Sequence, residues 1–217
     1  MKSKFLFAFA LCLFLDLSLI SALDTSSIIT TKAVAYGWLS FFIVPKCSSD
    51  LVPGWNFVSV CTNKTGSINE IFNYEQTNFR YILKWDGKEF QVYSPRALDN
   101  PFNLTNLNES YFILVDNVTS IGFGGANNSD LEISMNAGWN APSWPYEFNA
   151  SIIKYFNASL HKYLMKWNKQ SQEFEIYSPL AQSNPFDEIF VGEGQFILAT
   201  QPHLLIYNRS KLILNKK

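Results

Sequence analysis

The feature that constrains this chain most is an internal duplication. The stretch YSPRALDNPF begins at Tyr93, and YSPLAQSNPF begins at Tyr177, 84 positions later. Further matching segments keep the same order and nearly the same spacing: GWN at 54–56 and 138–140, SI at 67–68 and 151–152, and FIL at 112–114 and 196–198. The sequence therefore predicts one structural unit of about 84 residues that occurs twice, as residues 33–123 and 124–210.

Each copy contains the pattern of a β-hairpin. In RYILKWDGKEFQVYSP, Asp86-Gly87 predicts a two-residue turn, because both central positions of such a turn favour positive φ. This turn would place Trp85 opposite Lys88 and Leu83 opposite Phe90. The large apolar side chains of both strands would then share one face, with mainly polar side chains on the other.

The second hairpin, KYLMKWNKQSQEFEIYSP, has two extra residues at its turn. A four-residue loop, Asn168–Ser171, would place Trp167 opposite Gln172 and Met165 opposite Phe174. An insertion of two residues keeps every side chain on its face, whereas an insertion of one would reverse them all. The same face is therefore expected to be apolar in both copies.

Other segments predict further strands and a short helix. The motif SINE at 67–70 is a capping box, in which Ser67 and Glu70 each bond to the backbone of the other. Asn108 aligns with Gly192, which predicts a left-handed backbone at both positions. Strands are expected at 54–60, 111–116, 119–123, 195–200 and 203–207, with 33–44 and 129–135 adding an edge strand to each copy.

Composition supports a mainly β fold. The chain has 19 Phe, 10 Tyr and 6 Trp, and such flat, bulky side chains pack well on pleated surfaces. We predict a mainly β fold with short helices, in which the two tandem homologous units form a pseudo-two-fold sandwich or a partly open barrel. The formal net charge of −1 gives no general attraction to nucleic acid, so no nucleic-acid partner is expected.

Residues 1–22 predict a signal peptide. A basic start precedes the apolar run Phe5–Leu15, and the small residues Ser21-Ala22 offer a cleavage site. Two alternatives remain open, a buried core helix and an uncleaved membrane anchor over Phe5–Leu23. Asp16 would be costly inside a bilayer, so cleavage is favoured. The predicted location is secreted or at the cell surface.

The cysteines fit the same location. Cleavage would remove Cys12 and leave Cys47 and Cys61, and an even pair outside the cell usually forms a disulfide. The bond would close a loop of about 14 residues and would contribute roughly 3 kcal/mol. The alternative is two unrelated buried thiols. Two cysteines and the distant His161 and His203 do not form a ligand cluster, so no metal site and no cofactor are expected.

The chain is rich in N-x-S/T triplets, the acceptor sequence for N-glycosylation. Eight triplets occur, where about three would arise by chance from the same composition, and each is a candidate glycan acceptor on a surface turn. Clustering of Asn and Ser in turns is the alternative explanation for part of the excess. The candidate acceptors are Asn63, Asn103, Asn108, Asn117, Asn127, Asn149, Asn157 and Asn208.

The repeated motifs resemble a known group of proteins. GWN, a strand containing tryptophan, Y-x-P, and a glycine turn followed by F-I-L are similar to the GWNL-type tandem repeats of exported archaeal and bacterial surface proteins. Those repeats read G-W-N-L-I, W-x-G, Y-x-P and G-x-G-Y-W-I, and the resemblance covers residues 54–207. The second copy departs from the pattern after Trp139, where APSWP replaces an aliphatic run and a loop is expected. The resemblance implies a surface location and a β-rich module, and it implies no known activity.

The sequence shows no motif for catalysis. It has no G-x-S-x-G, no H-E-x-x-H and no phosphate-binding loop. Glu173 and Glu175 lie two apart on an expected strand and could form a glycosidase pair, although solubilising charge on a wet face is favoured. We therefore predict no catalytic residue, and an enzyme is the less favoured interpretation.

Exposed aromatic side chains are candidates for ligand binding, because Trp and Tyr form stacking platforms for sugars. Trp38 and Trp144 are the candidates, since neither has a tryptophan counterpart in the other copy. Even for these two residues, filling of the core or an edge is the favoured interpretation. The paired tryptophans are expected to serve the fold instead: Trp55, Trp85, Trp139 and Trp167.

Together these patterns favour an exported, glycosylated, non-catalytic module of the cell surface or envelope that acts by binding. Its partner would be an envelope component, a glycan or a surface protein. One alternative is a secreted hydrolase with its site in a cleft between the two units. Another is a membrane-anchored component held by an uncleaved N-terminal segment.

Overall fold

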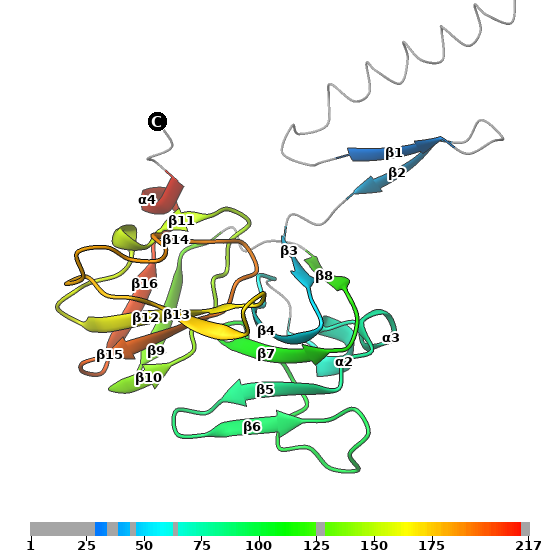
Figure 1. Cartoon of the computed structure of the whole chain (residues 1–217), viewed down its shortest axis with the longest axis horizontal. Helices are drawn as coiled ribbons and strands as arrows, with labels where there is room; N and C mark the ends of the chain where they lie inside the picture. The colour runs from blue at the N-terminus through cyan, green and yellow to red at the C-terminus, as the bar shows by residue number, and fades with distance from the viewer. Residues whose placement is uncertain (1–28, 34–38, 44–46, 63–64, 125–128, 214–217) are drawn as a thin grey trace, which may run out of the picture. The chain divides into compact units, whose positions relative to one another are not determined.

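A computed structural model of the chain describes residues 29–33, 39–43, 47–62, 65–124 and 129–213 (Figure 1). The chain divides into two compact units, Met1–Pro45 and Lys46–Lys217. In the first unit, strand β1 (Ile29–Ala33) pairs antiparallel with β2 (Leu39–Ile43). The predicted signal peptide lies outside the described residues. Within the described ranges, no helix has both the length and the apolar character needed to cross a membrane.

The unit Lys46–Lys217 is mainly β and contains two four-stranded antiparallel sheets. The first sheet has the order β4 (Gly54–Ser59), β7 (Ser110–Val115), β5 (Tyr81–Trp85) and β6 (Phe90–Tyr93). The second has the order β10 (Gly138–Asn140), β15 (Gln195–Ala199), β12 (His161–Asn168) and β13 (Glu173–Tyr177). In each sheet the last strand in sequence, β7 or β15, lies between the first strand and the hairpin.

Two-stranded ribbons accompany the sheets. The ribbon β3 (Cys47–Leu51) with β8 (Thr119–Gly124) belongs to the first copy, and β9 (Leu131–Met135) with β16 (His203–Tyr207) belongs to the second. The described strands form no closed barrel. The remaining elements are short: α2 (Ile68–Ile71), α3 (Tyr74–Thr77), β11 (Ala150–Ser151), the 3-10 helix η1 (Ile152–Lys154), β14 (Glu188–Ile189) and α4 (Arg209–Ile213).

The core of Lys46–Lys217 has three layers, because side chains of a strand alternate between the two faces of its sheet. On β7, Tyr111 and Ile113 point into a core that also contains side chains of β3, β8 and α2. Phe112 points the other way and belongs to a central cluster with Phe57 and Phe196. The ring centroids of Phe57 lie 4.3 Å from Phe112 and 4.9 Å from Phe196, so the two sheets pack face to face through stacked aromatic rings.

The second copy buries its own core behind its sheet. Leu164 of β12 and Ile197 of β15 pack there with Ile133 of β9 and Leu205 of β16. Burial on both faces of each sheet explains why the chain needs so many aromatic residues: they fill two outer cores and one shared central layer.

The hairpin register differs from the sequence prediction. Trp85 pairs with Phe90 and Leu83 with Val92, so the predicted pairing of Trp85 with Lys88 was wrong by two residues. The cause is the Asp86 side chain, whose Oδ1 accepts hydrogen bonds from the N–H groups of Lys88 and Glu89 at 2.9 and 3.0 Å. These bonds build a four-residue loop in place of the two-residue turn. A shift of two residues leaves each side chain on its predicted face.

The second hairpin shows the same correction. Trp167 pairs with Phe174, not with Gln172, and Met165 pairs with Ile176. Here Asn168 takes the part of Asp86, because its Oδ1 accepts from the N–H groups of residues 170 and 171.

The faces of the hairpins follow the prediction in part. Leu83 and Met165 pack against the central cluster, as expected for the apolar face. The opposite face was expected to be mainly polar, yet Ile82 and Tyr93 on that face are buried in the core of the first copy. The reason is that the β3–β8 ribbon and the helices cover this face, which the hairpin pattern alone does not reveal.

Other local predictions have mixed outcomes. The capping box is confirmed, with Ser67 accepting from the Glu70 N–H and the Glu70 carboxylate accepting from the Ser67 N–H. The predicted strand at 129–135 is confirmed as β9, whereas the segment 33–44 supplies β2, which pairs with β1. The partner of β8 is β3, which the sequence analysis missed. The left-handed backbone is present at Gly192, with φ of 76°, and absent at Asn108.

Candidate functional site

The two sheets are joined by backbone hydrogen bonds that run in both directions. The end of β4 pairs with the turn before β15, and the residues that follow β10 pair with the turn before β7. Four bonds make this junction: Gly194 N–H to Phe57 O (2.9 Å), Ser59 N–H to Gly192 O (2.9 Å), Ser110 N–H to Ala141 O (2.8 Å) and Ser143 N–H to Asn108 O (3.1 Å).

Two indoles cross the same junction. The Nε1–H of Trp85 donates to the carbonyl oxygen of Trp139 at 2.9 Å. The Nε1–H of Trp167 donates to the carbonyl oxygen of Trp55 at 2.8 Å. Each hairpin therefore uses its tryptophan to hold the GWN strand of the other copy.

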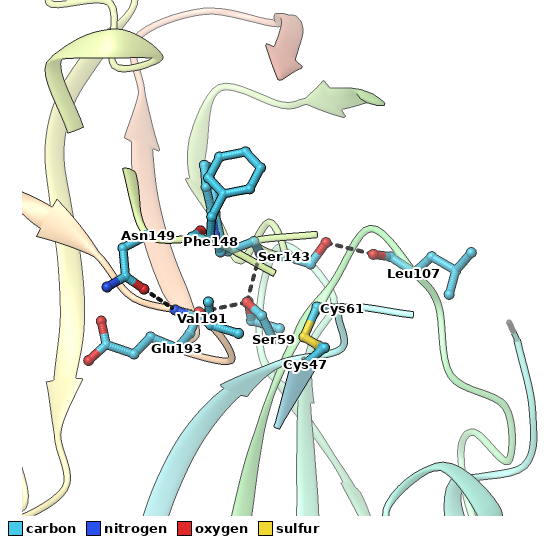
Figure 2. The surroundings of a disulfide bond; sticks show 11 residues. Cys47, Ser59, Cys61, Leu107, Ser143, Phe148, Asn149, Val191 and Glu193 are labelled. Atoms are coloured by element: carbon cyan, nitrogen blue, oxygen red, sulfur yellow. Dashed lines mark hydrogen bonds between the residues drawn. A yellow bond between two sulfur atoms is a disulfide. The ribbon is translucent and has the colours of Figure 1, made fainter. Parts of the chain in front are cut away.

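The disulfide lies beside this junction. Cys47 of β3 is bonded to Cys61, which follows β4 by two residues, as the sequence predicted. Figure 2 shows Ser59 next to this bond, with its hydroxyl donating to the Glu193 carbonyl at 2.7 Å and accepting from the Trp144 N–H at 2.8 Å. The disulfide therefore secures the end of β4 where the second copy docks.

A cleft of about 430 Å³ opens at one end of the junction. Its wall is formed by the first hairpin, by the loop before β7, and by β9 and β10 of the second copy. The wall carries aromatic, charged and amide groups, among them Lys84, Trp85, Asp86, Glu132, Asn136 and Trp139. Clefts of this size that combine aromatic surface with a few convergent polar groups are typical ligand sites.

Charges in this first cleft are largely committed to neighbours. The Lys84 ammonium lies 3.1 Å from the Glu109 carboxylate, and both side chains are mostly buried. The backbone N–H groups of Glu89 and then Lys88 lower the pKa of the Asp86 carboxyl, so this group stays ionised. The Asp86 carboxylate can therefore also accept hydrogen bonds from hydroxyl or N–H groups of a ligand.

A second cleft, of about 220 Å³, lies at the corresponding place in the other copy. Lys166 and Glu193, which align with Lys84 and Glu109, form an ion pair of 3.3 Å on its wall. Asn56, Trp167 and Asn168 line this cleft as Asn140, Trp85 and Asp86 line the first.

The second cleft is partly closed by the longer hairpin turn. The Oε1 of Gln172 accepts from the Trp55 N–H at 2.8 Å, and its Nε2 donates to the Trp55 carbonyl at 2.9 Å. The Lys169 ammonium donates to the Asp50 carbonyl at 2.5 Å. The longer turn thus places the side-chain amide of Gln172 against the edge of β4.

The first cleft has no such cover. A Cβ atom built on Gly54 would lie 2.7 Å from the Gln172 Oε1, whereas one built on Gly138 would meet no atom of the described residues within 4 Å. Both glycines have φ near 100° and occupy the same place before the tryptophan of GWN. The shorter turn at Asp86–Glu89 therefore leaves Trp139 accessible.

The aromatic residues proposed from sequence do not form this site. Trp144 is fully buried in the core of the second copy, where its indole donates to the Phe148 carbonyl, so the prediction that it is an exposed platform was wrong. Its aligned position in the first copy is Val60, which is also fully buried. Trp38 lies outside the described residues.

The duplication could have indicated the cleft. Lys-Trp precedes the hairpin turn in both copies, and Glu109 in the first copy aligns with Glu193 in the second.

The candidate glycan acceptors vary in exposure. Asn103, Asn117 and Asn157 are exposed, and Asn108, Asn149 and Asn208 are half-buried. The Asn149 side chain accepts from the Val191 N–H at 3.0 Å, so it is the least free of the six. Asn108 lines the first cleft. Asn63 and Asn127 lie outside the described residues.

The two histidines, 42 positions apart, meet away from the cleft. The Nε2 atoms of His161 and His203 lie 2.8 Å apart. The His161 Nδ1 accepts from the Asn157 N–H at 3.1 Å, and the His203 Nδ1 lies 3.0 Å from the Gln201 carbonyl. A single chain of hydrogen bonds fits both rings when each is neutral. No sequence pattern predicted this pair.

Glu173 and Glu175 also lie apart from the first cleft. Glu175 lines the second cleft and accepts from the Asn168 side chain at 2.8 Å, and Glu173 is exposed.

Comparison of the chain with protein-family models, with curated proteins and with solved structures finds no match.

Proposed function

We propose that this protein is an exported, glycosylated and non-catalytic module of the cell surface or envelope, which binds a saccharide in the first cleft. The observation that carries the proposal is the composition of that cleft. Trp85 and Trp139 supply aromatic surface, and side chains such as Glu132 and Asn136 supply hydrogen-bonding groups in the same cleft. Saccharides are recognised by this combination of a flat apolar surface and several polar partners.

The duplication is part of the proposal. Two copies of one ancestral unit would be related by a pseudo-two-fold rotation that exchanges Trp85 with Trp167 and Trp139 with Trp55. The matched strand orders of the two sheets support this relation. The reciprocal indole bonds and the four reciprocal backbone bonds of the junction support it further.

Export rests on three independent features. The N-terminal segment has the pattern of a signal peptide, and the Cys47–Cys61 disulfide suits an oxidising compartment. Several of the N-x-S/T triplets have an exposed asparagine. The resemblance to GWNL-type surface repeats points to the same location.

The cleft supports a hydrolase less well. A glycosidase acid needs a carboxyl group with a raised pKa. The pKa of Asp86 is lowered by the N–H groups of its own turn, and Glu109 is paired with Lys84. A binding role needs no carboxyl group with a raised pKa.

A saccharide array tests the binding proposal. Ser134 is exposed on β9 and lines the cleft, so Ser134→Tyr should fill it and abolish binding. Ile206→Tyr is the matched control, because Ile206 is exposed on the same ribbon and does not line the cleft. Binding that survives Ser134→Tyr, or no binding to any saccharide, would contradict the proposal.

Export and glycosylation are tested separately with the full chain in a glycosylating host. N-terminal sequencing of the secreted protein should show a start near Leu23, and glycosidase treatment should lower its mass. A secreted chain with an unshifted mass would remove the glycoprotein claim, and a start at Met1 would favour the anchored alternative.

A further inference from the structure

The second cleft shows which chemical group can occupy the edge of a GWN strand. The carboxamide of Gln172 makes two bonds to one residue, accepting from the Trp55 N–H at 2.8 Å and donating to the Trp55 carbonyl at 2.9 Å. This pair of bonds needs an amide N–H on the same side as the amide oxygen. A primary carboxamide has such an N–H, whereas the trans amide of a peptide bond lacks it. The edge therefore takes the side-chain amide of a glutamine or an asparagine.

The fold fills other single-residue edges in the same way. Within the described residues, four asparagine carboxamides each bond to the N–H and the carbonyl of one residue, over distances of 2.8–3.1 Å. The four edges form two matched sets, each filled in both copies: Asn56 on Val52 with Asn140 on Asn136, and Asn100 on Ser94 with Asn184 on Ser178. The edge at the tryptophan of GWN is different, because a described carboxamide fills it in one copy only.

Trp139 offers the edge that the described chain leaves open. It pairs with β15 in the same register as Trp55 pairs with β7, so its N–H and carbonyl have the same orientation relative to their sheet. No described atom lies within 4 Å of a Cβ built on Gly138, which is the place that Gln172 takes in the other copy. A carboxamide that enters the first cleft can therefore make the same two bonds to Trp139.

The turn that carries Gln172 makes a second contact, which also has a counterpart in the first cleft. Lys169, three residues before Gln172, donates from its ammonium group to the Asp50 carbonyl at 2.5 Å. Ser134 aligns with Asp50 and holds the same register position in the β9–β16 ribbon as Asp50 holds in the β3–β8 ribbon. Because Ser134 lines the first cleft, a lysine that enters the cleft can reach its carbonyl.

We propose that the first cleft receives a turn of a partner surface protein, and that this turn carries a lysine and, three residues later, a glutamine. The glutamine carboxamide accepts from the Trp139 N–H and donates to the Trp139 carbonyl, and the lysine ammonium donates to the Ser134 carbonyl. The carboxylates of Asp86 and Glu132 line the same cleft and attract the lysine. This protein ligand goes beyond the proposed saccharide and does not depend on it, because the two ligands share only the cleft.

The edge at Trp139 suits a single side chain better than a partner strand. On one side of it, the Asn140 side chain bonds to the N–H and carbonyl of Asn136 at 2.9 and 2.8 Å. On the other side, the Ser110 N–H donates to the Ala141 carbonyl. An added β-strand needs a longer ladder of bonds than the position between these contacts gives.

The reach of the side chain favours glutamine over asparagine. The four asparagines bond to residues that lie four or six positions away in the sequence. Gln172 bonds to Trp55 over 117 positions, from one copy to the other. A partner protein also approaches from outside the copy that it contacts, and the longer side chain serves that approach.

The probe for this site is a peptide of residues 166–175, KWNKQSQEFE, closed by a disulfide between a cysteine added at each end. It is titrated into the secreted chain after glycosidase treatment, so that no glycan on Asn108 enters the cleft. Calorimetry should show one peptide site per chain. Gln172→Glu in the peptide should bind at least about tenfold more weakly, because a carboxylate cannot donate to the Trp139 carbonyl. Gln170→Glu is the matched control, since it makes the same change of charge at an exposed residue of the turn and should bind like the native peptide.

Two further changes test the second contact and the place of binding. Lys169→Ala in the peptide should also weaken binding, because it removes the donor to the Ser134 carbonyl. In the protein, replacing residues 86–89 with the six residues of the second turn, NKQSQE, should fill the first cleft from within and abolish peptide binding. NAQSAE, a graft of the same length without the lysine and the last glutamine, should retain it.

The outcomes separate this inference from the saccharide function. No binding of the native peptide, or equal binding of the native and Gln172→Glu peptides, would overturn the inference. Binding of N-acetylglutamine methylamide at the affinity of the peptide would identify a small carboxamide as the ligand and would contradict a protein partner. None of these results bears on the saccharide array, which contains no peptide. An array without any bound saccharide removes the proposed function and leaves the turn site standing where the peptide binds.

Discussion

The indole N–H of Trp85 donates to the carbonyl of Trp139, a residue 54 positions away in the other copy. The aligned pair, Trp167 and Trp55, makes the same bond across the other side of the junction. Each bond joins a hairpin of one copy to the edge strand of the other. Loss of either bond therefore measures how much the junction between the copies contributes to stability.

Replacing either donor should weaken the protein to a similar extent. Trp85→Phe and Trp167→Phe each remove one half-buried indole bond and part of the central packing, so each should lower the free energy of unfolding by about 1–3 kcal/mol. Urea denaturation measures the change. Tyr81→Phe, at an exposed position of β5, is the control and should have little effect. A large loss for one tryptophan and none for the other would contradict the matched junction.

Two glycines at matched positions should respond differently to alanine. Gly54 and Gly138 both have positive φ, so alanine introduces strain of about 1–2 kcal/mol at either position. At Gly54 the added methyl group also meets Gln172, whereas at Gly138 it meets no atom of the described part of the chain within 4 Å. Gly54→Ala should therefore be the more destabilising of the two in thermal or urea unfolding. Equal losses would argue that Gln172 does not cover β4.

The disulfide should contribute to stability about as much as the length of its loop suggests. Both cysteines are fully buried, and the bond secures β3 to the end of β4 beside the junction. The double variant Cys47→Ala with Cys61→Ala should lose roughly 2–4 kcal/mol. The midpoint of urea unfolding with and without reductant gives the same comparison for the native chain. A midpoint insensitive to reductant would show that the bond does not constrain the fold.

The histidine pair predicts a loss of stability in acid. Burial and then the neighbouring His203 lower the pKa of His161 from 6.5 to about 4. Between these values the unfolded chain binds a proton that the folded chain does not, so stability is fully present above pH 6.5 and declines as the pH falls toward 4. The decline should be on the order of 2 kcal/mol between pH 7 and pH 4.5.

His161→Gln checks the assignment of this slope. A glutamine does not titrate, so unfolding free energies measured from pH 4.5 to 7 should vary less than those of the native chain. An unchanged slope in the variant would place the responsible group elsewhere.

Much of the fold could be predicted because side-chain alternation survives errors of register. The hairpins were expected with the wrong partners for Trp85 and Trp167, yet each side chain lies on its predicted face, since a shift of two residues preserves the faces. The register itself depends on Asp86 and Asn168, whose side chains bond to their own turns. At Asp86 these bonds favour a four-residue loop, whereas Asp-Gly favours a two-residue turn. The sequence pattern alone does not show which of the two turns forms.

The candidate site was harder to predict because it is made of contacts between the copies. The two extra residues of the second turn are visible in the sequence, but their effect depends on Gln172 reaching Trp55, 117 positions away. Trp144 was a binding candidate because it has no tryptophan counterpart, and the favoured interpretation, that it fills the core, is confirmed. Its alignment with the buried Val60 was the better guide.

An experimental structure of the mature protein tests the central claim most directly. The account predicts that a rotation of about a half-turn superimposes the sheet β4-β7-β5-β6 on β10-β15-β12-β13 and exchanges the Trp85–Trp139 bond with the Trp167–Trp55 bond, with Leu83 and Met165 inside. Sheets that do not superimpose, or a Leu83 and Met165 that face solvent, would contradict it.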